Sequence, residues 1–213
     1  MNWFTNTLGT SIGKKLMMAV TGLSFIGFLT LHLAGNLSIY GGPDSFNAYA
    51  EHLHALGPLL IIAEWILLTL AMVHVLTGTV LFLQNLAARP QRYRANKRAG
   101  GRTIGSATMP YTGILILLFV IFHLANFHFV DKSHTTIFQI VSQAFADPVY
   151  VAIYVLSMVV VAFHISHGFW SLFQTLGLNH PKYMPTVMAA GTIISLILGI
   201  GFGFLPIYIS FFA

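Results

Sequence analysis

Five stretches of the sequence are long and apolar enough to cross a lipid bilayer as α-helices. A bilayer core about 30 Å thick needs roughly 20 apolar residues of helix, because a helix rises about 1.5 Å per residue and satisfies its own backbone hydrogen bonds. Only 7% of the residues are charged, against about 25% in soluble domains. The sequence therefore predicts an all-α integral membrane protein, a single domain of residues 1–213 with five transmembrane helices. The predicted spans are 16–37, 59–86, 109–130, 149–176 and 187–211.

The first stretch is longer than the roughly 7–15 apolar residues of a signal peptide, so we expect it to be retained. The charged residues between the stretches are sorted by sign. Nine of the ten basic residues fall on one side, namely Lys14, Lys15, Arg89, Arg92, Arg94, Lys97, Arg98, Arg102 and Lys182. The other side holds Lys132, and all the acidic residues belong to that half, namely Asp44, Glu51, Glu64, Asp131 and Asp147.

This charge asymmetry predicts the topology by the positive-inside rule, with the N-terminus in the cytoplasm and the C-terminus outside. The net charge of +5 is then a consequence of topology, and we expect no nucleic-acid partner. The basic loop around Gly100 and Gly101 could contact anionic lipid headgroups or a partner protein. On the opposite side we expect two short amphipathic helices on the membrane surface, at 44–56 and 136–145. Their apolar residues at helical spacing are Phe46, Tyr49, Ala50, Leu53 and Leu56 in the first, and Phe138, Val141 and Phe145 in the second.

The sequence has ten histidines and no cysteine. Without cysteine, the chain itself cannot form a disulfide, an iron–sulfur cluster or a thiolate-ligated haem. An ionisable side chain inside a membrane is costly and indicates function by default. Five histidines lie inside the predicted spans, namely His32, His74, His123, His164 and His167, and His128 lies at the outer end of the third span. The remaining four, His52, His54, His134 and His180, lie in loops, where a solvated side chain is the ordinary interpretation.

Four of these histidines fall into two layers by depth. His32 is five residues and His123 seven residues from the outer end of its span, whereas His74 and His164 are each twelve residues from the inner end. Two imidazoles at one depth on different helices match the two axial positions of a haem iron. The spacing predicts two stacked b-type haems, the outer one bound by His32 and His123 and the inner one by His74 and His164. His167 lies one turn beyond His164, so spacing alone leaves the choice between them open.

Glycines follow three of these histidines at helical spacing: Gly35, Gly78 and Gly168. Residues three or four apart share a helix face, and a glycine there leaves room for a flat macrocycle against the backbone. The alternative is close packing of helices, which also favours glycine in membranes. For any single histidine, the alternative to haem ligation is a structural role as a hydrogen-bonded packing or gating residue.

Five segments of the sequence carry a resemblance to a known family. They are LHLAGN at 31–36, MVHVLTG at 72–78, FVIFHLAN at 119–126, FHISHGFWSL at 163–172 and DSFNAYAEHL at 44–53. With them the sequence resembles the five-helix, di-haem cytochrome b membrane-anchor subunit of succinate:quinone oxidoreductases, the group of succinate dehydrogenase and quinol:fumarate reductase. The resemblance covers nearly the whole chain and favours His164 over His167 as the fourth ligand. It also implies that the first four helices surround the haems, with the same two ligand pairs.

The resemblance implies a multi-pass subunit of a bacterial cytoplasmic (inner) membrane that transfers electrons between quinone and a cytoplasmic iron–sulfur subunit. Menaquinone is the expected quinone, and an FAD-containing flavoprotein subunit is expected to interconvert succinate and fumarate. This chain holds no residue set for dicarboxylate chemistry, and the complexes could form dimers.

Glu64 lies about five residues inside the second span, where a carboxylate costs about 2.5–3.5 kcal/mol on insertion scales. Related fumarate reductases use a glutamate at this place as the base that deprotonates quinol, and the alternative is an interfacial residue bonded to a loop. Some family members carry a further glutamate, implicated in proton movement, where this chain has Ala162. That departure puts such a proton route in doubt.

Two other functions fit part of the pattern. The cytochrome b subunit of a membrane-bound hydrogenase or formate dehydrogenase is also helical and histidine-rich, but the segment 44–53, Glu64 and the inner basic loops argue against it. A haem-free proton-coupled transporter would need polar residues along a continuous path, and the apolar fifth span offers little support for one.

Overall fold

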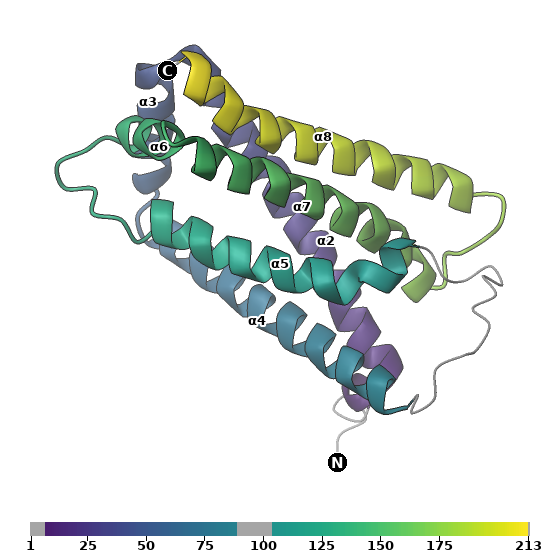
Figure 1. Cartoon of the computed structure of the whole chain (residues 1–213). Helices are drawn as coiled ribbons and strands as arrows, with labels where there is room; N and C mark the ends of the chain where they lie inside the picture. Colours follow the sequence, from purple (N-terminus) through teal and green to yellow (C-terminus); the bar gives the residue numbers. More distant parts are fainter. Residues whose placement is uncertain (1–6, 89–103, 213) are drawn as a thin grey trace.

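The structure, a computed structural model, describes residues 7–88 and 104–212, and within these ranges it is all-helical. Each of the five predicted spans corresponds to one long helix, and each such helix is long and apolar enough to cross a membrane. The prediction of a multi-pass, all-α membrane protein is confirmed at this level. The long helices are α2 (Ser11–Asn36), α4 (Pro58–Ala87), α5 (Ile104–Phe127), α7 (Pro148–Thr175) and α8 (Met184–Phe212), and the short ones are η1 (Leu37–Gly41), α3 (Pro43–His54) and α6 (Ile137–Phe145) (Figure 1).

The third span differs most from its predicted bounds. Helix α5 begins at Ile104, before the predicted start, and contains Pro110 in its second turn. It ends at Phe127, where the backbone N–H groups of His128 and Phe129 both donate to the carbonyl of Leu124 at 2.9 Å. The apolar run continues to residue 130, but the helix does not, because hydropathy does not report the hydrogen bonds that end a helix.

Two helices at the same end of the bundle begin with a Gly-Pro pair. Gly42 and Gly57 have φ angles of 87° and 54°, in the left-handed region that glycine adopts without steric cost. Pro43 and Pro58 follow as the first residues of α3 and α4. Proline suits this position because its fixed φ is helical and its missing N–H would have no partner there. These pairs explain why the chain turns sharply before each helix.

Four of the long helices form a ring. The neighbours around the ring are α2 with α4, α4 with α5, α5 with α7, and α7 with α2. Helix α8 lies outside the ring and packs along α7 and, less extensively, α2 (Figure 1). Two pairs of helices therefore face each other across the ring, α2 opposite α5 and α4 opposite α7.

The most densely packed part of the molecule lies where α2, α7 and α8 meet. Leu33, Met158, Leu198 and Leu205 are buried in this core. Small residues bring α7 and α8 together, because a Cβ added at Gly199 would lie 2.8 Å from the Cβ of Ala162. The position where some relatives of the resembled family carry a glutamate therefore faces α8 at close range.

Packing on the opposite side of the ring is loose. Among the side chains that the structure describes, α5 has none that is buried and α4 has only Thr77. Protein interiors normally pack as densely as organic crystals. The ring is thus tightly packed against α8 and loosely packed where α4 and α5 complete it.

The two predicted short helices are present as α3 and α6, and their position on the membrane surface stays a prediction. They are joined by a hydrogen bond from the Phe138 backbone N–H to Asn47 Oδ1 at 3.0 Å. Phe46 of α3 and Phe145 of α6 are buried in the protein core. Their apolar sides therefore pack on the end of the bundle as well as on each other, which the pattern of either helix alone did not reveal.

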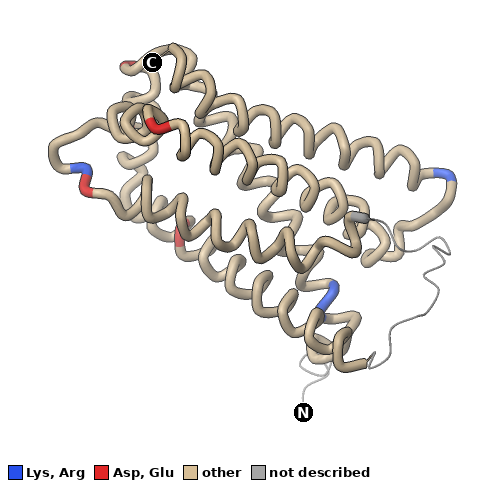
Figure 2. The backbone as a smooth tube through the Cα atoms, in the orientation of Figure 1, with Lys and Arg blue, Asp and Glu red and all other residues tan. Residues whose placement is uncertain are grey.

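The described charges gather at opposite ends of the bundle (Figure 2). Lys14 and Lys15 near the start of α2 lie at the same end as Lys182 between α7 and α8. At the other end lie Lys132 and four of the acidic residues, namely Asp44, Glu51, Asp131 and Asp147. The predicted basic loop at 89–102 lies outside the described residues. The membrane orientation stays a prediction.

Candidate functional site

His32 of α2 and His123 of α5 meet across the ring of helices. Their ring centres are 6.1 Å apart and their planes cross at 85°. A metal bonds an imidazole nitrogen at about 2 Å, so a metal held between two imidazoles separates their ring centres by roughly 6 Å. The separation of the outer pair matches this distance, and it is also within the range of ordinary edge-to-face ring pairs.

Aromatic rings surround this outer pair. Phe28 stacks on His32 with the ring centres 5.3 Å apart and the planes at 13°. Further rings around the pair belong to Phe202 beside His32, and to Phe119, Phe127 and Tyr154 beside His123. Such walls are apolar and flat, and they suit a planar, apolar ligand between the helices.

In the described structure, the Nδ1 atoms of His32 and His123 have only distant partners. Asn36 Nδ2 lies 3.5 Å from His32 Nδ1, and it donates instead to the carbonyl of His32 at 2.8 Å. Tyr154 Oη lies 3.5 Å from His123 Nδ1. Both contacts to Nδ1 are at the upper limit of a hydrogen bond.

The inner pair is held differently, by one hydroxyl group for each ring. Thr21 Oγ1 of α2 lies 2.9 Å from His74 Nδ1 of α4. Thr112 Oγ1 of α5 lies 3.0 Å from His164 Nδ1 of α7. In both cases a threonine of one helix bonds a histidine of the adjacent helix. These threonines were missed at the sequence level, and their Thr-Gly dipeptide recurs at 77–78, so the dipeptide alone does not identify them.

His74 and His164 extend from α4 and α7, the second pair of helices that face each other across the ring. His167 lies elsewhere, with its Cβ 2.9 Å from where a Cβ on Gly105 would be and its ring edge-on to Trp170. His164 shares with His74 a hydrogen bond to a threonine of the neighbouring helix.

The four imidazoles are only partly buried, although they extend toward the inside of the ring. In the described ranges no three His, Cys, Asp or Glu side chains gather as ligands for a bare metal ion. A haem iron needs only two axial ligands from the protein, because the porphyrin supplies the others. Each pair of facing histidines supplies the two protein ligands that one haem iron would need.

The three predicted glycines have different surroundings. A Cβ at Gly35 would collide with the hydroxyl of Tyr49 in α3. A Cβ at Gly78 would lie 3.4 Å from the Met18 methyl carbon, and at Gly168 it would meet no atom within 4 Å. Close packing, the alternative to macrocycle contact, therefore describes Gly35, whereas a Cβ at Gly78 would make an ordinary contact and Gly168 borders open space.

Glu64 lies near the start of α4, opposite the end of α5. Its Oε1 is 3.9 Å from His128 Nδ1, and the two side chains are 44% and 42% exposed. A carboxylate at this point of an apolar helix is costly in a membrane, so stability alone gives little reason to place it there.

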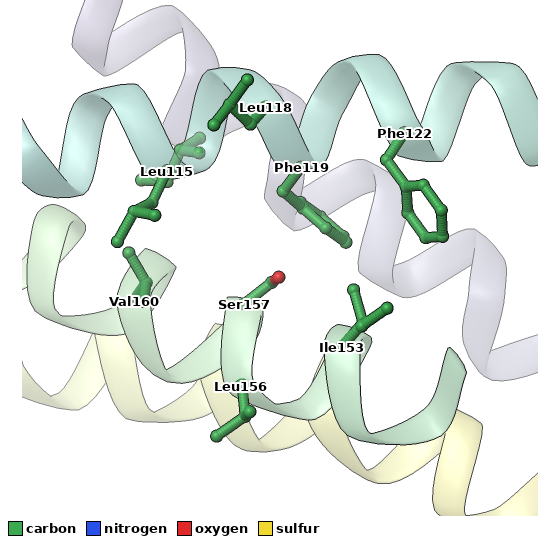
Figure 3. Close-up of a pocket in the computed structure, with 9 residues that line it drawn as sticks. Leu115, Leu118, Phe119, Phe122, Ile153, Leu156, Ser157 and Val160 are labelled. Atoms are coloured by element: carbon green, nitrogen blue, oxygen red, sulfur yellow. The ribbon is translucent and has the colours of Figure 1, made fainter. Parts of the chain in front are cut away.

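An apolar groove of about 370 Å³ runs between α5 and α7 (Figure 3). Phe119 and Phe122 line it from α5, and Ile153, Ser157 and Val160 line it from α7. Ser157 has the one polar side chain among its lining residues. In volume it falls in the range of small-molecule sites, and along α5 it lies between Thr112 and His123.

Comparison with the known protein families, with curated proteins and with solved structures finds no match to this chain.

Proposed function

We propose that this chain is a di-haem cytochrome b subunit that anchors a succinate dehydrogenase or fumarate reductase complex in a bacterial cytoplasmic membrane. The observation that carries the proposal is the pair His32 and His123, with ring centres 6.1 Å apart across the ring of helices. The second pair, His74 and His164, extends from the other two opposed helices. Two such pairs are difficult to explain by packing, because each histidine in lipid is costly.

In this proposal the four histidines hold two b haems, the outer one by His32 and His123 and the inner one by His74 and His164. The haems, when bound, supply one-electron redox chemistry between quinol and the iron–sulfur subunit. The aromatic side chains around His32 and His123 keep water away from the outer site. Menaquinone is the quinone that we expect.

Oxidation of a quinol releases two electrons and two protons, so the protein must accept protons where electrons leave. Glu64 is the proposed acceptor, because it is a carboxylate in the outer part of α4 with His128 3.9 Å away. Both side chains are partly exposed, and a proton can therefore pass from this pair to the outer surface. A base placed within reach of the quinol hydroxyl typically contributes about 10²–10⁴-fold to the rate.

The partners of the proposed complex dock at the inner end of the bundle. Lys14, Lys15 and Lys182 mark this end in the described residues. The iron–sulfur subunit would lie next to the inner haem, and the FAD-containing flavoprotein beyond it. Succinate and fumarate never reach this chain in the proposal.

The experiment that tests the proposal is a haem count on the purified chain, from a pyridine haemochrome and a reduced-minus-oxidised difference spectrum. We expect two b haems per chain. A preparation that contains the folded chain without haem would overturn the proposal and favour a haem-free transporter. Co-purified partners that oxidise hydrogen or formate, with no succinate-dependent reduction of the haems, would instead favour the hydrogenase or formate dehydrogenase alternative.

A further inference from the structure

The inner histidines are each bonded by a threonine of the neighbouring helix, in two arrangements that match closely. Thr21 is followed by Gly22 on α2, and Thr112 by Gly113 on α5. The distances from hydroxyl oxygen to imidazole Nδ1 are 2.9 and 3.0 Å. The same contact thus occurs twice, from helices that face each other across the ring.

The direction of the Thr21 bond follows from where its one proton points. The Thr21 hydroxyl donates to the backbone carbonyl of Met17 at 2.7 Å. Two oxygens this close without a proton between them would repel, so the proton lies between them. Thr21 Oγ1 must then accept from His74, which assigns the proton on His74 to Nδ1.

Thr112 has the same choice of partners. Its hydroxyl donates toward the carbonyls of Met109 and Thr108 at 3.1 and 3.2 Å. Oγ1 is then free to accept from His164 Nδ1. The Thr21 bond therefore places the proton of His74 on Nδ1 and its lone pair on Nε2, the state that a metal ligand needs, and the Thr112 bond allows the same state at His164.

The glycines after the threonines keep space beside the same rings. A Cβ at Gly22 would lie 3.6 Å from Cε1 of His74, and a Cβ at Gly113 would lie 3.7 Å from Cε1 of His164. The Cε1 atom is bonded to both ring nitrogens. A methyl group in either place would occupy volume beside the Nε2 atom that binds the metal.

The outer pair lacks a comparable arrangement. Its Nδ1 atoms lie 3.5 Å from Asn36 Nδ2 and from Tyr154 Oη. A short bond from Nδ1–H fixes ring orientation and makes the ligand more basic, which stabilises the oxidised metal. The two sites therefore differ in the hydrogen bonding of their ligands, and only the inner pair has short hydroxyl partners in the described structure.

We propose that Thr21 and Thr112 are positioning residues for the inner haem, which hold His74 and His164 in the Nδ1–H tautomer and lower the midpoint potential of that haem alone. This inference rests on the proposed function. It adds two residues that act through the ligands and do not touch the haem iron.

The test is a redox titration of the haems in the variants Thr21→Val and Thr112→Val, with the chain in its complex. Valine keeps the shape of threonine and removes the hydroxyl. We expect the inner haem to titrate at a higher potential in each variant, the outer haem to keep its potential, and the electron paramagnetic resonance signal of the inner low-spin haem to shift. Thr21→Ser and Thr112→Ser restore the hydroxyl and should restore both values.

The matched control is Thr79→Val in α4, because the hydroxyl of Thr79 donates only to its own helix, at Val75. An unchanged inner potential in both valine variants overturns the inference, as does an equal shift in the control. Loss of the inner haem alone supports it if the serine variants regain that haem, and overturns it if they do not. A parent protein without haem refutes the proposed function itself, so the two failures are distinguishable.

Discussion

Each of the four inward-facing imidazoles has two ring nitrogens, Nδ1 and Nε2. The described contacts involve Nδ1: two threonine hydroxyls for the inner rings, and the more distant Asn36 and Tyr154 for the outer ones. In our proposal the partner of Nε2 is a haem iron. At the residue scale, the decisive question is therefore which histidines bind haem.

Single replacement of a ligand should remove one haem. We expect His32→Ala and His123→Ala each to lose the outer haem, and His74→Ala and His164→Ala each to lose the inner one, so that the haem count falls from two to one per chain. His167→Ala is the matched control, because His167 packs on Gly105 and Trp170, and it should keep both. If His167→Ala loses a haem while His164→Ala keeps two, the fourth ligand has been assigned wrongly.

Replacement of Glu64 should separate proton transfer from haem binding. We expect Glu64→Gln to keep both haems and to lose quinol oxidation by about 10²–10⁴-fold, the usual contribution of a general base. Steady-state oxidation of a quinol analogue by the complex measures this. Glu51→Gln is the control, since Glu51 is an exposed carboxylate of α3. Unchanged turnover in Glu64→Gln would exclude Glu64 as an essential base.

At the scale of elements, α3 is held on α2 by a close contact. Gly35 leaves room for the ring of Tyr49, because any Cβ at residue 35 would overlap its hydroxyl and ring carbons. Overpacking of this kind costs typically about 1–3 kcal/mol. The contact links α3 to α2, the helix that carries His32. The interpretation of Gly35 as a haem contact does not predict it.

Gly35→Ala should therefore destabilise the protein by about 1–3 kcal/mol in an otherwise native chain. In a Tyr49→Ala background the same change should be neutral or stabilising, because alanine suits a helix better than glycine by about 0.5–1 kcal/mol. Thermal unfolding in detergent measures this double-mutant cycle. Gly27→Ala in the same helix is the control, since a Cβ there meets no atom within 4 Å. An equal effect in both backgrounds would show that Tyr49 is not the cause.

At the scale of the whole molecule, the two ends of the bundle differ in the charged residues that the structure describes (Figure 2). The sequence contains no cysteine, so one introduced thiol reports one position. Ser133, between α5 and α6, and Lys182, between α7 and α8, are both exposed and lie at opposite ends. The two positions can therefore test the predicted orientation.

We expect Ser133→Cys to react with a membrane-impermeant maleimide in intact spheroplasts, because the positive-inside rule places it outside. Lys182→Cys should react only after the membrane is permeabilised. Labelling is measured by the mass shift of the purified chain, and the parent chain without cysteine gives the background. The reverse pattern would mean that the bundle is inserted the other way.

The sequence alone determined the features that depend on composition and on position along a helix. The five spans, the two short helices α3 and α6, the charge difference between the ends and the two histidine layers all follow from counting residues. Bilayer thickness and the rise of a helix turn such counts into depth. The placement of His32 opposite His123 was predictable in this way.

Only the tertiary structure decided which face of each helix turns inward. Lipid-facing and core-facing residues of a membrane helix are both apolar, so periodicity does not distinguish them. The contacts of Gly35 with Tyr49 and of the Thr21 and Thr112 hydroxyls with inner histidines depend on how each helix is rotated against its neighbours. Rotation is set by side-chain packing between segments more than 50 residues apart in the sequence, such as Thr21 and His74, and a count along one chain cannot contain that information.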